Sequence, residues 1–591
     1  MKKTFLKITS FAISATFLFS VIGCEKKQNE SQPHVHDFSC KVAEEKYLDT
    51  EESCLQSAKY YFSCVCGEKG KETFNYGVAS GHNSNGEVVA DAYLQTPATC
   101  ISPAVYYASC STCGKIRKNR TFIYGANSDV HDYSKEVVGV EYLKAEATFQ
   151  SAEEFYKSCK LCGEKGTETF FYGEPLKEYT QEERNARMPI SLCVSLYDSE
   201  NSIYGFTYNT ESKPLRPEIQ ICEGNSLRSS YKEYYGTVQK ETTLTASGTA
   251  IEYYIVKAEV KLETNTIYSY RAYDKYAEVG SQVATIKTKD TQTTQFAFAH
   301  VSDSQKSANN NTGIGSGDYF GQVLSNIVDR NDLIVHTGDI VQDAQYEGYW
   351  TSALNDNFAY LSKIPVMAIS GNHEGGSENG NETFKHFHYK IPQQTTTLGL
   401  YYSFTYGNTK FIMLNTNNFD TAQLNWVKAE LTNNTSTWTI VAMHCPMYSV
   451  GSWGANPERY WQSLNLRSQL QGIFAENGVD IVLQGHDHTV SRTYPINKNG
   501  QPQTENYQTE NGVEYSVNPS GVIYVMNGPA GNQTRSPYEI DTNLYKYGVS
   551  SQERSWADFT IDGDTMKVSV KYYDGTEVKT YYTWGIKKTM A

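Results

Sequence analysis

Polar residues that suit metal ions follow five apolar segments in the C-terminal half of the chain. Each segment is short and rich in β-branched residues, so we expect it to form a buried strand. In open α/β sheets, sites assemble at the carboxyl ends of strands, and residues that follow several strands are expected to meet. Their types suit divalent metals that prefer oxygen and nitrogen ligands. The residues after the five segments are Asp303, Asp339, Asn372, His444, and the pair His486 and His488.

The motifs D-x-Q, GD, GNHE, H and GHxH occur in this order, and together they resemble the metal-binding motifs of calcineurin-like metallophosphoesterases. Within that family, the branch that includes the purple acid phosphatases is the most similar. The resemblance extends from about Ser191 to the C-terminus. It implies an α/β domain of two packed mixed sheets flanked by helices, which hydrolyses phosphate esters.

The resemblance also implies which residues hold two divalent ions, for which Fe, Mn and Zn are all suitable. Two such ions about 3.5–4 Å apart neutralise the phosphate charge and supply a hydroxide that attacks phosphorus. Asp339 would bridge them. The other expected ligands are Asp303, His488 and, weakly through its amide oxygen, Gln305 at one ion, and Asn372, His444 and His486 at the other.

His373 is expected to act on the substrate and not on the metals, because its neighbour Asn372 already takes the ligand position. We expect His373 to hydrogen-bond the phosphate, together with Asn372, and to protonate the leaving alkoxide. A structural role in its loop is the alternative. Glu374 is expected to orient His373, as carboxylates beside a metal site commonly orient histidines.

Four further residues near the motifs could carry chemistry. Asp487 is expected to point away from the metals. Cys445 is expected to be a packed thiol, since no base is evident for it. The sequence does not decide whether His386 and His388 reach the substrate or lie at the surface.

Gln342 marks a departure from the purple acid phosphatase pattern. In that family a tyrosine stands three residues after the aspartate of the GD motif, and its phenolate binds ferric iron and gives the colour. Glutamine cannot supply a phenolate, so the sequence predicts a colourless enzyme with a divalent pair. Gln305 likewise stands where many calcineurin-like enzymes have a histidine, which predicts that the first metal exchanges easily.

Residues 1–23 have the features of a bacterial lipoprotein signal peptide, with three lysines before an apolar segment at residues 11–21. That segment is too short for a membrane-spanning helix, which needs about 20 apolar residues. The sequence V-I-G-C resembles a lipobox, so we expect cleavage before Cys24 and lipidation of its thiol. An ordinary signal peptide is the alternative. Residues 24–35 would be a tether that holds the protein to a membrane of the bacterial cell envelope, outside the cytoplasm.

Three copies of a small repeat occupy residues 36–173, at 36–77, 82–125 and 131–173. Each copy opens on a histidine, contains a Tyr-Leu pair, and continues through two closely spaced cysteines and a glycine to a Tyr-Gly pair. The copies are aromatic and rich in turn residues, so we expect mostly β structure. Their position suggests a stalk or an attachment module.

One histidine and three cysteines in each of the first two copies could close a tetrahedral zinc site. Such short modules bury little apolar surface and commonly need a metal ion or a disulfide to stabilise them. The third copy does not fit a zinc site, because Phe149 stands where a cysteine is expected. Disulfides or free thiols are the alternatives, since disulfides form outside the cytosol. The candidate zinc ligands are His36, Cys54, Cys64 and Cys66 in the first copy, and His82, Cys100, Cys110 and Cys113 in the second.

The remaining chain divides into a linker at residues 174–187, a β-sandwich at 188–290 and the phosphoesterase domain at 294–591. Period-two alternation with polar turns predicts the sandwich, which resembles the fibronectin-III-like domain of purple acid phosphatases. The formal net charge of −14 makes nucleic acid an unexpected partner. The whole chain is thus expected to be an extracytoplasmic phosphatase or phosphodiesterase for small phosphoesters. A cell-surface binding protein with a catalytically weak domain is the alternative.

Overall fold

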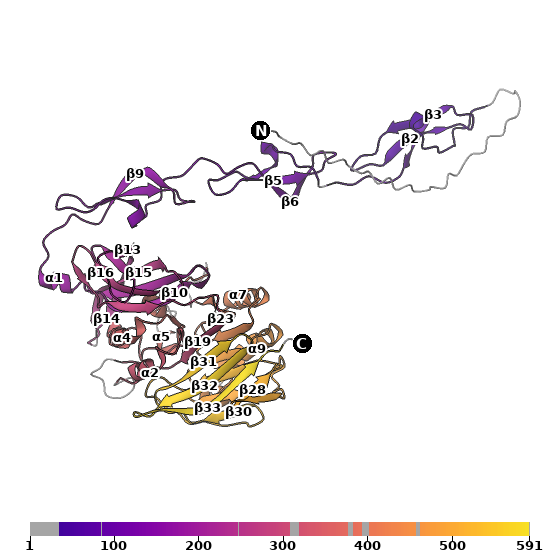
Figure 1. Cartoon of the computed structure of the whole chain (residues 1–591). Coiled ribbons are helices and arrows are strands. Elements are labelled where there is room, and N and C mark those ends of the chain that lie inside the picture. The colour runs from indigo at the N-terminus through magenta and orange to yellow at the C-terminus, as the bar shows by residue number, and fades with distance from the viewer. Residues whose placement is uncertain are drawn as a thin grey trace, which may run out of the picture. The chain divides into compact units, whose positions relative to one another are not determined.

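The computed structural model describes residues 35–83, 85–245, 247–307, 318–375, 382–392, 401–456 and 461–589 (Figure 1). The expected signal peptide and Cys24 lie outside the described residues. The chain divides into two compact units, one of Met1–Glu136 with Lys157–Glu168 and one of Val137–Tyr156 with Thr169–Ala591. Within the described ranges, no helix is long and apolar enough to cross a membrane.

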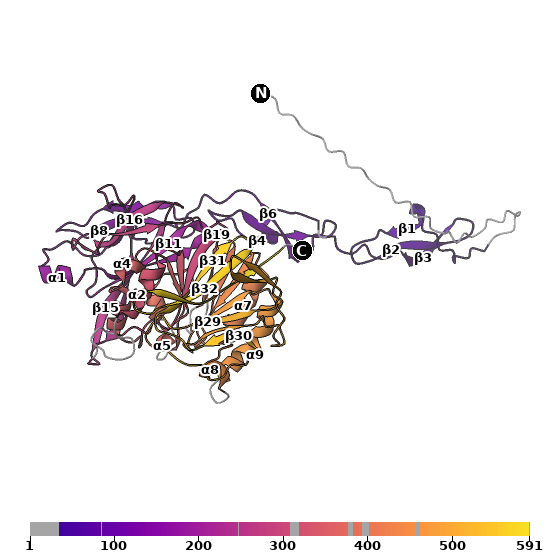
Figure 2. The same cartoon turned by 60° about the horizontal axis from the view of Figure 1, so that its bottom comes forward.

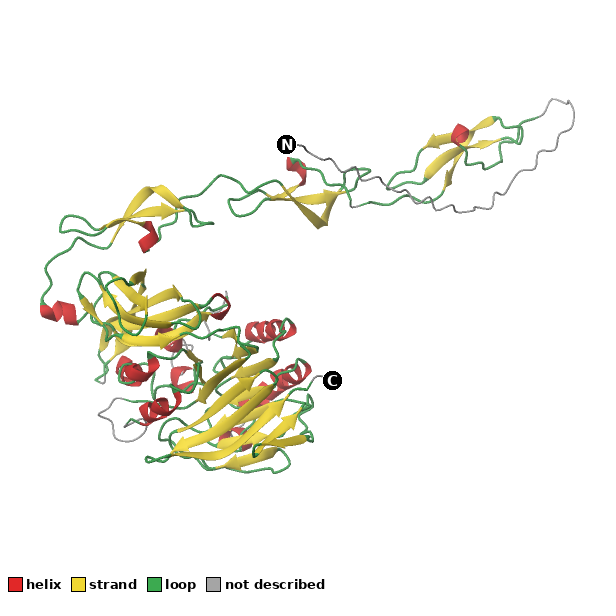
Figure 3. Ribbon diagram, in the orientation of Figure 1, coloured by secondary structure: helices red, strands yellow, loops and turns green. Residues whose placement is uncertain are grey.

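The repeats form small antiparallel sheets, in the orders β1-β2-β3 and β4-β5-β6 for the first two copies (Figure 3). A single 3₁₀ turn precedes each sheet and holds the tyrosine of the Tyr-Leu pair. Tyr47 donates a hydrogen bond to the carbonyl of Gly67 at 3.0 Å, and Tyr93 donates to Gly114 at 3.1 Å. These bonds fix the turn that carries the two closely spaced cysteines.

The elements of the three copies are η1 (Glu45–Tyr47), β1 (Leu48–Thr50), β2 (Ala58–Ser63) and β3 (Lys69–Tyr76); η2 (Asp91–Tyr93), β4 (Leu94–Thr96), β5 (Ala104–Ser109) and β6 (Ile116–Tyr124); and η3 (Val140–Tyr142), β7 (Leu143–Ala145), β8 (Glu153–Ser158) and β9 (Lys165–Tyr172). The boundary between the two compact units runs through the third copy.

A β-sandwich follows the repeats, after the short helix α1 (Gln181–Asn185), which Thr180 caps. Its strand alternation places Phe206 and Tyr270 in the core, where their rings meet edge to face at 5.0 Å. One sheet has the order β10-β11-β15-β14 and the other β13-β12-β16-β17, with β18 beside β16. The strands are β10 (Ile190–Asp198), β11 (Ile203–Thr210), β12 (Pro217–Glu223), β13 (Lys232–Tyr235), β14 (Thr237–Leu244), β15 (Ala250–Lys261), β16 (Ile267–Asp274), β17 (Val279–Gly280) and β18 (Ala284–Lys287).

The C-terminal domain contains two packed mixed sheets with helices beside them, so the predicted fold class is confirmed (Figure 2). The eight-stranded sheet has the order β21-β20-β19-β31-β32-β33-β28-β27. Its strands are β19 (Gln295–Val301), β20 (Leu333–His336), β21 (Val366–Ala368), β27 (Tyr507–Glu510), β28 (Val513–Val517), β31 (Ser555–Asp562), β32 (Thr565–Tyr573) and β33 (Val578–Lys587).

The seven-stranded sheet has the order β22-β23-β24-β25-β29-β26-β30. Phe298 joins the two sheets, because its ring stacks on Phe559 at 4.5 Å and meets Phe411 edge to face at 5.2 Å. The strands are β22 (Tyr402–Tyr406), β23 (Thr409–Met413), β24 (Trp438–Ala442), β25 (Ile481–Gln484), β26 (Val490–Thr493), β29 (Ile523–Asn527) and β30 (Tyr545–Val549).

Apolar faces of helices cover both sheets. Leu431 and Leu470, on two different helices, share one buried cluster with Val441 and Val482 of the seven-stranded sheet. The helices are α2 (Tyr319–Ile327), α3 (Glu347–Leu354), α4 (Phe358–Leu361), α5 (Asn372–Gly375), α6 (Glu382–His386), α7 (Thr421–Thr432), α8 (Ser452–Ala455) and α9 (Trp461–Glu476). Strands β19, β20 and β21 run parallel, as do β24 and β25, so the loops after them lie at the carboxyl edges of the two sheets.

Candidate metal centre

Two groups of side chains, buried except for the partly exposed His486, meet at these strand ends and share one residue. Asp339 is that residue, and in each group the potential ligand atoms lie within 4.8 Å of one another. The groups are Asp303, Asp339 and His488, and Asp339, His444 and His486. One carboxylate shared by two sets of ligands suits a site for two metal ions.

The backbone at these residues is unusual. Five residues expected at the site adopt the left-handed conformation, with φ between 40° and 74°. Such conformations cost about 1–3 kcal/mol each in non-glycine residues and cluster at functional sites. The residues are Asp303, Gln305, Asp339, His486 and His488.

Two glycines let the GD and GNHE loops approach closely. Gly338 has φ +93°, and a Cβ atom there would lie 2.4 Å from the backbone nitrogen of Gly371. A Cβ atom on Gly371 would in turn lie 2.1 Å from the Asp339 carboxylate. Larger residues would therefore separate the two loops and move Asp339 away from Asn372.

Backbone carbonyls orient two of the histidines. Nδ1 of His444 bonds to the carbonyl of Thr337, and Nδ1 of His488 bonds to the carbonyl of Gln533, both at 2.8 Å. Because a carbonyl only accepts, each Nδ1 carries the proton and a neutral ring has its lone pair on Nε2. Both Nε2 atoms face carboxylates, at 3.2 Å from Asp339 and Asp303 respectively. This is the orientation of a metal-binding histidine.

The atoms around the amide oxygen of Asn372 show whether a cation fits this site. Oδ1 lies 3.0 Å from His444 Nε2 and 2.6 Å from His486 Nδ1. In neutral His444 the Nε2 atom carries a lone pair and cannot donate to this oxygen. The Asn372 oxygen and this nitrogen then face each other with lone pairs, and a cation between them would bind both, so the donor set fits a metal.

The electrostatics of the site favour positive charge. Burial opposes ionisation of Asp303 and Asp339, yet the histidines beside them lower the pKa of both carboxyls. Burial also opposes protonation of His444, but Asp339 and Asp303 raise its pKa to about 9. A bound cation would take the place of that proton, as metal binding commonly releases protons.

Two buried polar atoms at the site have no hydrogen-bond partner among the described residues: Nε2 of His486 and Oε1 of Gln305. Buried polar atoms are nearly always paired, so the unpaired amide oxygen of Gln305 points to a missing ligand. Gln305 is buried, and its N–H donates to the carbonyl of Asp339 at 2.8 Å. Gln305 therefore lies next to the shared aspartate, Asp339.

Glu374 does not orient His373, so this expectation is wrong. Its carboxylate accepts hydrogen bonds from the N–H groups of Asp339, Ile340, Val341 and Gly371, at 2.7–3.1 Å. Burial and the charge of Asp339 raise the pKa of Glu374 to about 7, while the N–H groups favour its charged form. Glu374 ties the GD loop to the GNHE loop, and so it positions Asp339.

His373 lies at the edge of the site, where its side chain is 27 % exposed. Nδ1 is bonded to the carbonyl of Gln342 at 2.6 Å, and Nε2 is 3.8 Å from an Asp339 oxygen. The backbone of Gln342 thus holds the ring, at the position where the related family has a tyrosine. Nε2 remains available to a substrate beside the metal ligands.

The other four candidate residues have structural contacts. Asp487 accepts hydrogen bonds from the N–H groups at the start of α8, and Cys445 is buried, which raises its pKa to about 12. His386 is buried and stacks on Trp350 at 4.1 Å. His388 lies 3.3 Å from the Glu259 carboxylate of the sandwich.

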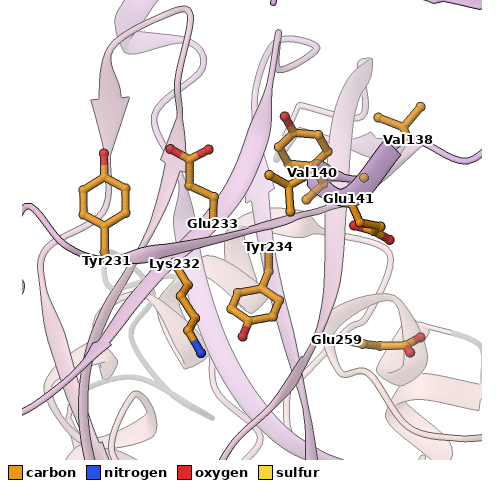
Figure 4. A pocket seen from close by; sticks show the side chains of 10 residues that line it. Val138, Val140, Glu141, Tyr231, Lys232, Glu233, Tyr234 and Glu259 are labelled. Carbon is orange, nitrogen blue, oxygen red and sulfur yellow. The ribbon is translucent and has the colours of Figure 1, made fainter. Parts of the chain in front are cut away.

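A hollow of about 270 Å³ opens beside the ligands. Asn372, His444 and His486 form one side, and Asn417 and Gln462 contribute amides to it. A larger hollow of about 550 Å³ lies between residues 138–141 and the sandwich, and Figure 4 shows its Glu, Lys and Tyr side chains. It contains none of the expected metal ligands, so we place the candidate site at the smaller hollow.

The sequence did not reveal several residues that complete this site. The carbonyls of Thr337 and Gln533 fix the histidines, and any residue type could supply them. Asn417 donates to the carbonyl of Gly371 at 2.7 Å, and Arg535 donates to the carbonyl of His486 at 3.3 Å. Neither lies in a motif, so no sequence pattern indicated them.

The cysteines and histidines of the repeats are grouped differently from the expectation. Cys54 lies with His82, Cys110 and Cys113 of the next copy, and not with the ligands of its own copy. Cys100 similarly lies with His131, Cys159 and Cys162 of the third copy. His36, Cys64 and Cys66 form a group of three.

Comparisons with known proteins agree with the fold and the motifs. Residues 296–490 match the model of the calcineurin-like phosphoesterase family. Purple acid phosphatase 15 of Arabidopsis thaliana is 28% identical over 201 residues, which cover 32% of this chain and 33% of that protein. Purple acid phosphatase 22 of the same plant is 25% identical over 333 residues, covering 53% of this chain and 68% of that protein.

The structure of the purple acid phosphatase PPD1 from yellow lupin (Lupinus luteus) is similar, with a TM-score of 0.57 and 18% identity. The alignment covers 74% of this chain and 80% of that one, and at this identity it shows the fold alone. The chain spans about a third to a half of the length of the first curated relatives that it matches. The C-terminal part of this chain is therefore a calcineurin-like phosphoesterase domain, related to the purple acid phosphatases.

Proposed function

We propose that the C-terminal domain hydrolyses phosphate mono- or diesters with two divalent metal ions. One observation carries this proposal: buried Asp339 is shared by two groups of ligands, Asp303 with His488 and His444 with His486. The names of the relatives, which are purple acid phosphatases, agree with it.

The residues would act in separate roles. Asp339 would hold both ions, and Asn372 would add an uncharged ligand that leaves room for the phosphate charge. When bound, the two ions neutralise the phosphate and supply hydroxide near neutral pH. Fe, Mn and Zn all suit these ligands, and the glutamine at position 342 favours a divalent pair without a strong visible band.

His373 would act on the leaving group. Its Nδ1–H is held by the carbonyl of Gln342, so Nε2 is the ring nitrogen left for the substrate, 3.8 Å from an Asp339 oxygen. Protonated there, Nε2 would donate a hydrogen bond to the phosphate and then its proton to the departing oxygen. The partial exposure of the ring lets it regain a proton from water after each turnover.

Hydrolysis of an aryl phosphate and of its bis-ester by the metal-loaded full chain tests the proposal. We expect release of the aryl alcohol from at least one of them. The ratio of the two rates gives the preference for monoesters or diesters. Binding of inorganic phosphate without hydrolysis of either compound would instead support the alternative, a cell-surface binding protein.

We further propose that the protein is lipid-anchored in the bacterial cell envelope, outside the cytoplasm. The lipobox-like sequence before Cys24 supports this. Cys24→Ser should release the protein from the membrane fraction or leave the signal peptide uncleaved, whereas Cys222→Ser should stay with the membranes. A processed Cys24→Ser protein that remains in the membrane fraction would contradict the anchor.

A further inference from the structure

The repeats contain two groups of one histidine and three cysteines, and each group joins two consecutive copies. In the first group, Cys54 comes from the first copy, and its sulfur lies 3.4 Å from that of Cys110 in the second. The sulfur of Cys113 lies 3.4 Å from Nδ1 of His82. All four ligand atoms lie within 4.8 Å of one another.

The second group repeats this arrangement one copy further along. The sulfur of Cys100 lies 3.6 Å from that of Cys159, and the sulfur of Cys162 lies 3.2 Å from Nδ1 of His131. Sequence alignment within the chain places Cys100 at the position of Cys54. The same repeat position therefore always contributes its sulfur to the copy that follows.

These distances suit a tetrahedral metal ion. Ligands at about 2.3 Å from zinc are separated by about 3.8 Å along the edges of the tetrahedron. A disulfide would bring two sulfurs to about 2.05 Å. It would also use only two of the three cysteines and leave a thiol and an imidazole facing each other. The cysteines of both groups are free.

The turn between the paired cysteines also directs backbone N–H groups at a sulfur. The N–H groups of Thr112 and Cys113 hydrogen-bond to the sulfur of Cys110. Gly114 closes this turn in the left-handed conformation, with φ +73°, and its N–H bonds to the carbonyl of Cys110 at 2.8 Å. A thiolate with such support is the form that binds a metal.

The pairing between copies explains the irregular third copy. Phe149 stands at the position of Cys54 and Cys100, and its side chain is exposed. A cysteine at this position serves the following copy, and the chain continues from the third copy into the helix α1 and the sandwich. The third copy nevertheless retains His131, Cys159 and Cys162, which complete the site begun by the second copy.

We propose that each of the two four-residue groups binds one structural zinc ion, and that these ions fasten consecutive repeats to one another. The repeats bury few apolar side chains, so cross-linking by metal would supply stability that their cores cannot. The zinc would therefore stabilise both the fold of each copy and the junction between copies.

Zinc content of full-length variants tests the pairing. After zinc loading and exposure to a moderate chelator, Cys54→Ser and Cys110→Ser should each retain one zinc fewer than the parent protein. The double variant should also retain one fewer, because both residues serve the same ion. Cys54→Ser combined with Cys100→Ser should retain two fewer. Cys222→Ser, outside the repeats, should match the parent, and zinc bound by the phosphoesterase domain is constant throughout.

Sites built within single copies would give the reverse pattern. Cys54→Ser with Cys110→Ser would then lose two ions, and Cys100→Ser with Cys110→Ser only one, which would overturn the proposal. Cobalt loading gives a second readout, since cobalt–thiolate absorption should fall with each site removed. Detection of a Cys54–Cys110 disulfide in the unreduced protein, with unchanged zinc content in the variants, would also overturn it.

Discussion

The phosphoesterase domain and the repeats both gather side chains that could bind metal, but they do so in opposite ways. In the domain, Asp303 and His488 are buried and lie 185 positions apart in the printed sequence, at the ends of strands in different sheets. In the repeats, each four-residue group comes from two adjacent copies and includes one exposed cysteine, Cys113 or Cys162.

The difference concerns what holds each site in place. In the domain, a large core of two packed sheets and their helices positions the ligands before any metal binds. In the repeats, little apolar surface is buried, so the ligands are held together by turns and by each other. We infer that the fold supports the metal centre in the domain, whereas metal supports the fold in the repeats.

Removal of all metal should give the largest difference between the two regions. With a strong chelator, we expect phosphoesterase activity to vanish while the domain keeps its fold. The repeats should lose structure, because zinc contributes about 10–16 kcal/mol in small zinc modules. Hydrogen exchange should show fast exchange in β1–β6 and retained protection in β19, β20, β24 and β25. Equal protection of both regions after chelation would show that metal does not support the fold of the repeats.

Asp339→Ala should abolish nearly all activity and both metals of the domain, because it removes the shared carboxylate. Metal analysis and turnover of an aryl phosphate measure this. Asp420→Ala is a matched control: Asp420 caps α7 by accepting from Gln423 at 2.8 Å. Its loss should cost about 1 kcal/mol of stability and no metal. An Asp339→Ala protein with two bound ions would refute the shared role.

His373→Ala should slow turnover by about 10²–10⁴-fold, the range for a general acid, with both metals retained. His388→Ala is the control, since His388 contacts the sandwich and should leave the rate unchanged. If His373→Ala instead lost metal, His373 would be a ligand and its assigned role would be wrong.

Glu374→Gln should have the smallest effect, a loss of about 1–3 kcal/mol in the free energy of unfolding. The substitution turns an acceptor into an amide donor that faces N–H groups of the two loops. Because Glu374 positions Asp339, metal affinity should fall together with stability. Thermal unfolding and metal titration measure the two effects. Unchanged metal affinity in a destabilised protein would show that the loops do not depend on each other.

The sequence alone determined the ligand candidates of the domain and its fold class. Apolar segments that end in Asp, Asn or His are local features, and their order along the chain resembles one family. The repeats were equally visible, because their spacing is regular. Both signals depend on residue type and sequence distance, which folding does not change.

Only the tertiary structure decided which residues meet. Glu374 accepts from N–H groups of two loops, and Cys54 joins the copy after its own. His386 contacts Trp350 and His388 contacts Glu259, and both of these partners come from other elements. These partners are distant in the sequence, and several are backbone groups that every residue type supplies, so only the packing of the chain could select them.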